Sequence, residues 1–173
     1  MDKNQINFTP RAQKVVKDAK LEAYKLNQEA AGLEHLFLAF LNVQNSEIND
    51  ILEDLGIDTV ELKELVFQNL NRGEFKSEDF TKVSYTNNIR EALTKSRKLA
   101  LRLNHSFVSC EHLFYSFLKM PNCPAVEFFN MLEIDTKEIL NRLKTFFDID
   151  DLHQEKTEHS KEDKIPALSS FAV

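Results

Sequence analysis

Two acid–histidine pairs are the residues whose types first suggest chemistry. Glu34-His35 lies in the segment LEHLFLAFL and Glu111-His112 in CEHLFYSFL. A carboxylate beside an imidazole is typical of acid–base catalysis or of a metal site. Adjacent residues of a helix point about 100° apart, so the members of one pair cannot face one substrate. Neither histidine has the partner four residues away that a zinc-binding HExxH helix needs. We therefore expect no catalytic and no metal-binding residue here, and two partly buried histidines hydrogen-bonded to backbone.

The two glutamates allow a second interpretation. Glu34 and Glu111 fall in the first turn of predicted helices, where a carboxylate gains about 0.3–1 kcal/mol from the helix dipole. That gain alone explains them, but both could also face a ligand. Thr9 and Thr86 show the same ambiguity, because each is first a helix cap and only then a contact. These four residues are the candidate binding residues.

Other catalytic motifs are missing from the sequence. Cys110 stands at a predicted helix start, which can lower a thiol pKa, but no base lies beside it and the matching residue of the repeat described below is Leu33. The chain has no GxxxxGK[ST], GxGxxG or GxSxG sequence. The pattern favours a non-catalytic binding module. A helical hydrolase remains the alternative, and it requires the two glutamates or the two histidines to converge in one pocket.

An internal repeat organises the chain. The two acid–histidine pairs are 77 residues apart (111 − 34), and the same offset aligns further residues from about position 8 to about 70 without a gap. Such a register is hard to obtain by chance and indicates a duplication. The aligned pairs include Phe8 with Tyr85, Thr9 with Thr86, Asn27 with Asn104, Leu55 with Leu132, and Ile57-Asp58-Thr59 with Ile134-Asp135-Thr136.

Helical spacing and capping residues predict an all-α fold of eight helices, arranged as two tandem pseudo-symmetric four-helix repeats. The repeats cover residues 8–70 and 85–147, with a linker at 71–84 and an acidic flexible linker at 148–173. The expected helices run from Pro10 to near Asn27, from Gly32, from Asn45-Ser46 to Gly56 and from Asp58-Thr59, then from Thr86 to Leu103, from Ser109, after Pro124, and from Asp135 to Phe147.

Composition narrows the class of protein. The 173 residues include 42% hydrophobic residues but only 3 Gly and 4 Pro, which favours long helices around a real core. A net charge of −6 argues against a general binder of nucleic acid or anionic membranes. No apolar run approaches the 18 residues of a membrane span and no signal peptide is apparent, so we expect a cytoplasmic protein. Two cysteines make no disulfide framework.

The duplicated motif resembles a known family. FTPRAQKVVKDAKLEAYKLN with GLEHLFLAFL, and then YTNNIREALTKSRKLALRLNHSFVSCEHLFYSFL, are similar to the N-terminal domain of the Clp/Hsp100 AAA+ unfoldases, closest to ClpC and then ClpA. Residues 164–171 resemble the segment that opens the first ATPase module of these proteins. We therefore expect an AAA+ module to follow this chain in a longer protein. A stand-alone adaptor or accessory subunit without an ATPase is the alternative, which that segment disfavours.

The resemblance implies a function and partners. The chain would be a substrate- and adaptor-docking domain of an ATP-dependent unfoldase, without a cofactor of its own. ATP and a ClpP-type peptidase would bind the AAA+ modules outside it. The isolated domain would be a monomer and the parent protein a hexamer.

The resemblance also implies a ligand. In ClpC-type domains, phosphoarginine-tagged substrates dock at two equivalent sites, which would match Thr9 with Glu34 and Thr86 with Glu111. A carboxylate can hold the guanidinium group, and a helix start can hold the phosphate. The chain departs from the family's Gly-Thr-Glu-His pattern, with Leu33 and Cys110 at the Thr position. It also carries Asn87-Asn88 where the family usually has Pro-Arg.

Overall fold

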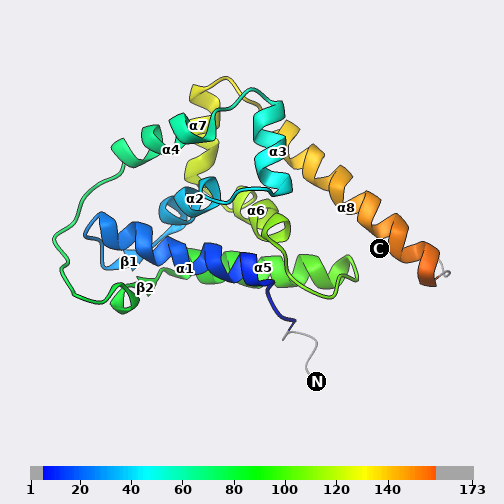
Figure 1. The fold of residues 1–173 in the computed structure, drawn as a ribbon, viewed down its shortest axis with the longest axis horizontal. Coiled ribbons are helices and arrows are strands. Elements are labelled where there is room, and N and C mark those ends of the chain that lie inside the picture. The colour runs from blue at the N-terminus through cyan, green and yellow to red at the C-terminus, as the bar shows by residue number, and fades with distance from the viewer. Residues whose placement is uncertain (1–5, 159–173) are drawn as a thin grey trace.

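The computed structural model describes residues 6–158, and in that part the chain forms eight α-helices, as predicted. Figure 1 shows their arrangement. Three very short elements, the strands β1 and β2 and the 3-10 turn η2, lie between helices. The bounds are α1 Pro10–Lys25, β1 Ala30–Ala31, α2 Leu33–Leu41, α3 Glu47–Asp54, α4 Thr59–Gln68, η2 Phe80–Lys82, β2 Ser84–Tyr85, α5 Asn87–Arg102, α6 Cys110–Leu118, α7 Pro124–Met131 and α8 Thr136–Glu158.

The duplication is visible in the backbone. Helices α1, α2 and α3 begin and end 77 residues before α5, α6 and α7, for example at Pro10 and Asn87 (87 − 10). The turns repeat as well, because positive φ angles recur at matching positions. They occur at Asn27 and Asn104, at Asn45 and Asn122, and at Gly56 and Glu133. The two repeats predicted from the sequence are therefore confirmed.

Side-chain caps place the helix starts where the sequence predicts them. Thr9 Oγ1 accepts a hydrogen bond from the Ala12 backbone N–H at 3.1 Å, and Pro10 occupies the first helical position of α1. Asp58 caps α4 by accepting from the backbone N–H groups of Val60 and Glu61. These local contacts fix the directions from which the helices enter the core.

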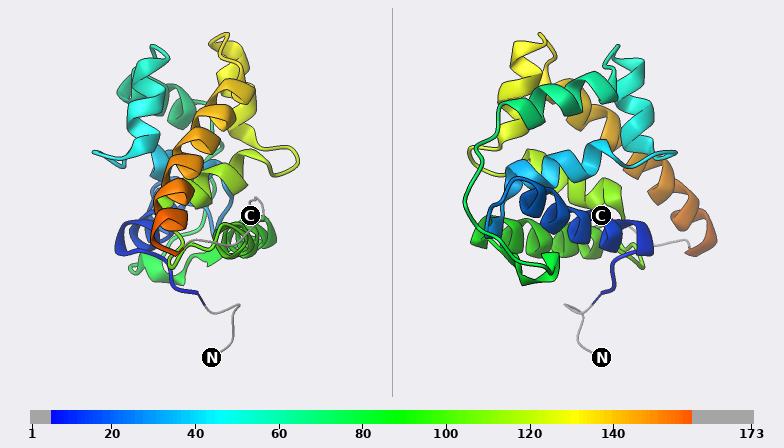
Figure 2. Two further views of the ribbon diagram at one scale, coloured as in Figure 1. Left: turned by 90° about the vertical axis from the view of Figure 1, so that its right-hand side faces the viewer. Right: turned by 60° about the vertical axis from the view of Figure 1, so that its left-hand side comes forward.

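The two repeats share one core. Helices α2 and α6 lie between a layer formed by α1 and α5 and a layer formed by α3, α4 and α7 (Figures 1 and 2). Phe37 and Phe40 of α2 pack against Phe114 and Phe117 of α6. The ring centroids of Phe40 and Phe114 are 4.9 Å apart, and those of Phe37 and Phe117 are 5.9 Å apart. All four rings are at most 1% exposed, so neither repeat has a separate hydrophobic interior.

Two details differ from the sequence prediction. The last helix was expected to end near Phe147, but α8 continues to Glu158, so the predicted linker begins with helix. Within the predicted linker 71–84, η2 and the start of β2 form, and β2 pairs in parallel with β1. A two-residue strand has too short a pattern to be recognised in a sequence. The rest of the predicted acidic linker, 159–173, lies outside the described residues.

Candidate functional site

The histidines of both acid–histidine pairs accept hydrogen bonds from backbone N–H groups at the starts of their helices. His35 Nδ1 accepts a hydrogen bond from the Gly32 backbone N–H at 2.9 Å, and His112 Nδ1 accepts from the Ser109 N–H at 2.9 Å. At the start of α6 this bond completes a capping box, because Ser109 Oγ accepts from the His112 N–H in return; at the start of α2 His35 supplies only half of that motif, since Gly32 has no side chain. Both side chains are only 3% exposed. The predicted structural role of the histidines is confirmed. Burial lowers the pKa of His35, although Glu34 and Glu22 act in the opposite direction.

A third histidine joins the second pair. His105 Nδ1 lies 2.7 Å from His112 Nε2, and both rings are buried. Because His112 Nδ1 accepts from backbone, its proton resides on Nε2, which donates to His105. The Phe147 ring of α8 stacks on His112 with a centroid distance of 5.0 Å. Burial, followed by the effect of His105, lowers the pKa of His112 to about 3, which keeps the imidazole neutral.

Short backbone contacts tie the start of each long helix to the other repeat. The Thr9 N–H donates to Val108 O at 2.9 Å, and the Thr86 N–H donates to Ala31 O at 3.0 Å. The segment before α1 is thereby held against the segment before α6, and the segment before α5 against the segment before α2. This exchange is symmetric, because Ala31 and Val108 occupy matching positions of the two repeats.

The candidate binding residues consequently pair across the repeats. One pocket contains Glu34 and Thr86, and a second contains Glu111 and Thr9. The pairing within each repeat, Thr9 with Glu34 and Thr86 with Glu111, was therefore wrong. The four residues stay candidates, as two acids beside two helix starts, and the exchanged backbone contacts decide which acid lies near which start. The two pockets are separate, so the convergence that a helical hydrolase requires is not found among the described residues.

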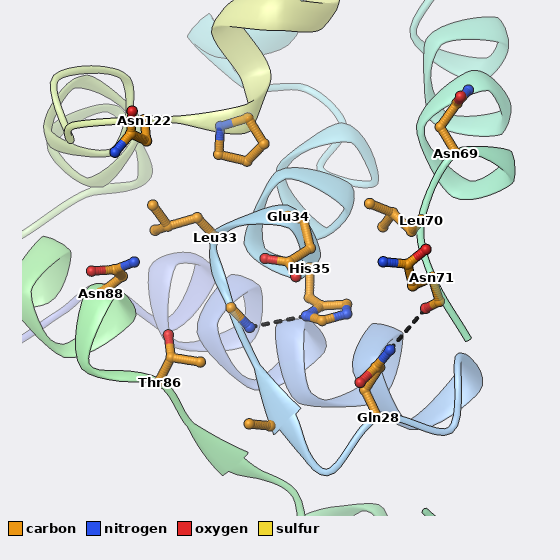
Figure 3. A pocket seen from close by; sticks show the side chains of 13 residues that line it. Gln28, Leu33, Glu34, His35, Asn69, Leu70, Asn71, Thr86, Asn88 and Asn122 are labelled. Atoms are coloured by element: carbon orange, nitrogen blue, oxygen red, sulfur yellow. Dashed lines mark hydrogen bonds between the residues drawn. The ribbon is translucent and has the colours of Figure 1, made fainter. Parts of the chain in front are cut away.

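The first pocket is a cavity of about 550 Å³. Figure 3 shows Glu34 from the start of α2, with Thr86 and Asn88 from the start of α5 on one side and Asn69 and Asn71 on the other. Thr86 Oγ1 caps α5 by accepting from the Ile89 N–H at 3.4 Å. The earlier N–H groups of α5 have no acceptor within the helix. The pocket thus joins one carboxylate, one helix start and several amide side chains.

The second pocket is smaller, about 290 Å³, and has more apolar walls. It is lined by Thr9, Ser109, Glu111, the two bonded histidines, and the neighbouring residues Ser106, Phe107, Phe146 and Phe147. Glu111 Oε2 accepts a hydrogen bond from the Glu47 backbone N–H, at the first position of α3, over 3.3 Å. One carboxylate oxygen is therefore already engaged within the protein.

Several lining residues were not predicted from the sequence. Gln28, Asn69, Asn71, Asn88 and Asn122 line the first pocket, yet they come from segments far apart in the chain and form no local motif. Asn27 and Asn104, which the repeat had aligned, instead supply the left-handed turns after α1 and α5.

The two cysteines do not have the environment of nucleophiles. A helix start can lower a thiol pKa, but at Cys110 burial and the Glu111 carboxylate raise the pKa to about 12, in agreement with the expectation that Cys110 is no nucleophile. Burial also raises the pKa of Cys123 to about 11. Among residues 6–148, whose side chains are described, no cluster of three or more His, Cys, Asp or Glu side chains could hold a metal ion. No helix of the described part of the chain is long and apolar enough to cross a membrane.

Comparison with solved structures supports the fold. The chain superposes on the N-terminal domain of the chaperone ClpD from Arabidopsis thaliana with a TM-score of 0.66 and 14% identity, covering 82% of this chain and 95% of that one. The Hsp104 N-terminal domain from Candida albicans gives a TM-score of 0.64 and 15% identity, covering 79% and 89%. At these identities the likeness concerns the fold alone.

Sequence comparison extends the likeness to the family. A probable ATP-dependent Clp protease ATP-binding subunit from Chlamydia pneumoniae is 31% identical over 143 residues, which is 80% of this chain and 17% of that protein. The ClpC subunit from Staphylococcus saprophyticus is 24% identical over 165 residues, 95% and 20%. This chain thus spans only about a fifth of these relatives. The model of the Clp repeat (R) N-terminal domain matches residues 7–132 and 84–167. With its duplicated helices and cross-paired pockets, the chain belongs to the Clp repeat N-terminal domain family.

Proposed function

We propose that this chain is the substrate- and adaptor-docking domain of an ATP-dependent, ClpC-like unfoldase, and that phosphoarginine side chains of tagged substrates bind where a carboxylate and a helix start meet in one pocket. The observation that carries the proposal is the cross-repeat pairing. Each pocket joins a carboxylate from the start of a short central helix to the capped start of a long helix. Those two features suit the two ends of one ligand.

The chemistry of the first pocket illustrates this fit. The Glu34 carboxylate offers oxygen acceptors to the guanidinium N–H groups, which form strong charge-assisted hydrogen bonds. The start of α5 offers backbone N–H groups and the positive end of a helix dipole to the phosphoryl group. Asn88, at the second position of α5, replaces a basic residue usual in the family, and its amide can donate to the same oxygens.

The remaining functions belong to parts of a longer protein. The relatives are described as ATP-binding subunits of Clp proteases, and the chain matches 17 to 20% of their length. ATP binding, hexamer formation and contact with a ClpP-type peptidase are therefore proposed for segments outside this chain, and the complex is proposed to act in the cytoplasm. In this proposal the domain presents substrates to the ATPase ring and binds adaptor proteins.

Isothermal calorimetry with phosphoarginine tests the ligand. Binding is expected for the wild-type chain and is expected to be lost in the double variant Glu34→Ala/Glu111→Ala. Glu64→Ala removes an exposed acid of α4 outside both pockets and serves as the matched control. Free arginine and inorganic phosphate, titrated separately, should each bind more weakly than phosphoarginine. Absence of binding, or equal binding by the double variant, would refute phosphoarginine recognition.

A further inference from the structure

We propose that the two pockets are unequal, and that the Glu34 pocket takes one guanidinium-bearing ligand per chain while the Glu111 pocket is closed to it by an internal contact. This inference deepens the proposed function and rests on it for the identity of the natural ligand. It depends on three differences at two matched positions of the repeats, Gly32 with Ser109 and Glu47 with Pro124.

The first difference lies beside the acids. Gly32 precedes Glu34 by two residues, and a Cβ built on Gly32 would stand only 2.6 Å from Glu34 Oε1. The Glu34 carboxylate therefore occupies space next to Gly32 that is free only because glycine has no Cβ. The matching residue in the second repeat is Ser109, whose own side chain caps α6 by accepting from the His112 N–H. The Glu111 carboxylate takes a different direction.

The second difference decides where the Glu111 carboxylate goes. It reaches the backbone N–H of Glu47 at the start of α3, 3.3 Å away. The residue matching Glu47 is Pro124, at the start of α7 and on the wall of the first pocket. Proline has no N–H to donate. Among residues 6–148, whose side chains are described, no protein group hydrogen-bonds the Glu34 carboxylate, so its oxygens are available to a ligand.

The third difference is charge. The Glu47 side chain carries a second carboxylate close to Glu111, and burial with the neighbouring acids, Glu111 among them, raises the pKa of Glu47. Glu47 does not itself line the second pocket, but its negative charge adds to that of Glu111, which does. Pro124, the counterpart of Glu47 on the wall of the first pocket, adds no charge there. The cavity volumes, about 550 and 290 Å³, favour the same pocket.

Calorimetry with phosphoarginine distinguishes one site from two. We expect one ligand per wild-type chain, a loss of affinity of at least about tenfold in Glu34→Ala, and a change of less than about twofold in Glu111→Ala. Two ligands per chain, with each single variant removing one of them, would overturn the inequality.

A gain-of-function variant tests the cause. Glu47→Pro gives the second pocket the proline of the first. Position 47 tolerates it, because it is the first residue of α3 and Ser46 before it has the extended backbone, φ −125° and ψ 163°, that a following proline requires. We expect a second ligand to bind this variant. Glu47→Gln is the matched control, since it removes the same charge but keeps the N–H. If both variants bind only one ligand, or both bind two, the hydrogen bond is not what closes the pocket.

The inequality can be tested without phosphoarginine. If phosphoarginine binds neither pocket, the proposed function fails, and titration with methylguanidinium followed by amide NMR still compares the two carboxylates. Shifts concentrated around Glu34 support the inequality, and equal shifts around Glu34 and Glu111 overturn it. In addition, the Glu47 amide should exchange with solvent faster in Glu111→Ala than in the wild type. Unchanged exchange would contradict the internal contact.

Discussion

Acid should destabilise this domain through the buried imidazole of His112. In the native state the ring is neutral, because its Nδ1 accepts from the Ser109 N–H and its Nε2 donates to His105. In the unfolded chain the same imidazole titrates with an ordinary pKa of about 6.5. Since the folded pKa is lowered to about 3, the unfolded state binds a proton that the native state refuses at any pH between these values.

The size of the effect follows from that gap. The stabilisation is fully present above about pH 6.5 and is lost progressively as the pH falls toward 3. At pH 5 the solution lies about 1.5 pH units below the unfolded pKa of about 6.5. Protonation then stabilises the unfolded state by about 2 kcal/mol, at about 1.4 kcal/mol per pH unit. That is a large fraction of the 5–15 kcal/mol typical of a domain.

Urea unfolding at pH 7, 6 and 5 measures the loss. His112→Gln is the matched variant, because Ser-x-x-Gln retains the capping box and removes the titrating ring. The difference in unfolding free energy between pH 7 and pH 5 should be about 2 kcal/mol larger in the wild type than in the variant. Carboxylates titrate in both proteins and cancel in this comparison. Equal pH dependence of the two proteins would refute the assignment.

Three further outcomes are expected. Glu133 has φ 61° where the first repeat has Gly56 at φ 82°, so Glu133→Gly should raise the unfolding free energy by about 1 kcal/mol and Gly56→Ala should lower it by a similar amount, both measured by urea titration. A gain from Gly56→Ala would contradict this. The thiols of Cys110 and Cys123, with pKa values of about 12 and 11, should resist a thiol reagent at pH 8 until urea unfolds the chain, and rapid labelling of the native protein would be inconsistent with their burial. Phe40→Ala should cost about 3–5 kcal/mol and leave a single unfolding transition by circular dichroism, because both repeats share that core, whereas two separated transitions would show independent repeats.

Local chemistry explains why so many of the helix predictions succeed. Thr9, Ser46, Asp58 and Thr86 cap the helices that follow them, and each cap acts within three residues. Helical periodicity acts over similarly short distances, so both signals can be seen in a sequence. The end of α8 was missed for the same reason. After Phe147 the apolar periodicity stops, although the helix continues to Glu158.

The sequence by itself determined the duplication, the helices and the four candidate binding residues, because repeated motifs, caps and periodicity are properties of neighbouring residues. Only the tertiary structure decided that Glu34 lies with Thr86 and Glu111 with Thr9, since that pairing depends on backbone hydrogen bonds from Thr9 to Val108 and from Thr86 to Ala31. These bonds join residues far apart in the chain and use atoms that every residue type except proline possesses, so they leave no mark in the sequence.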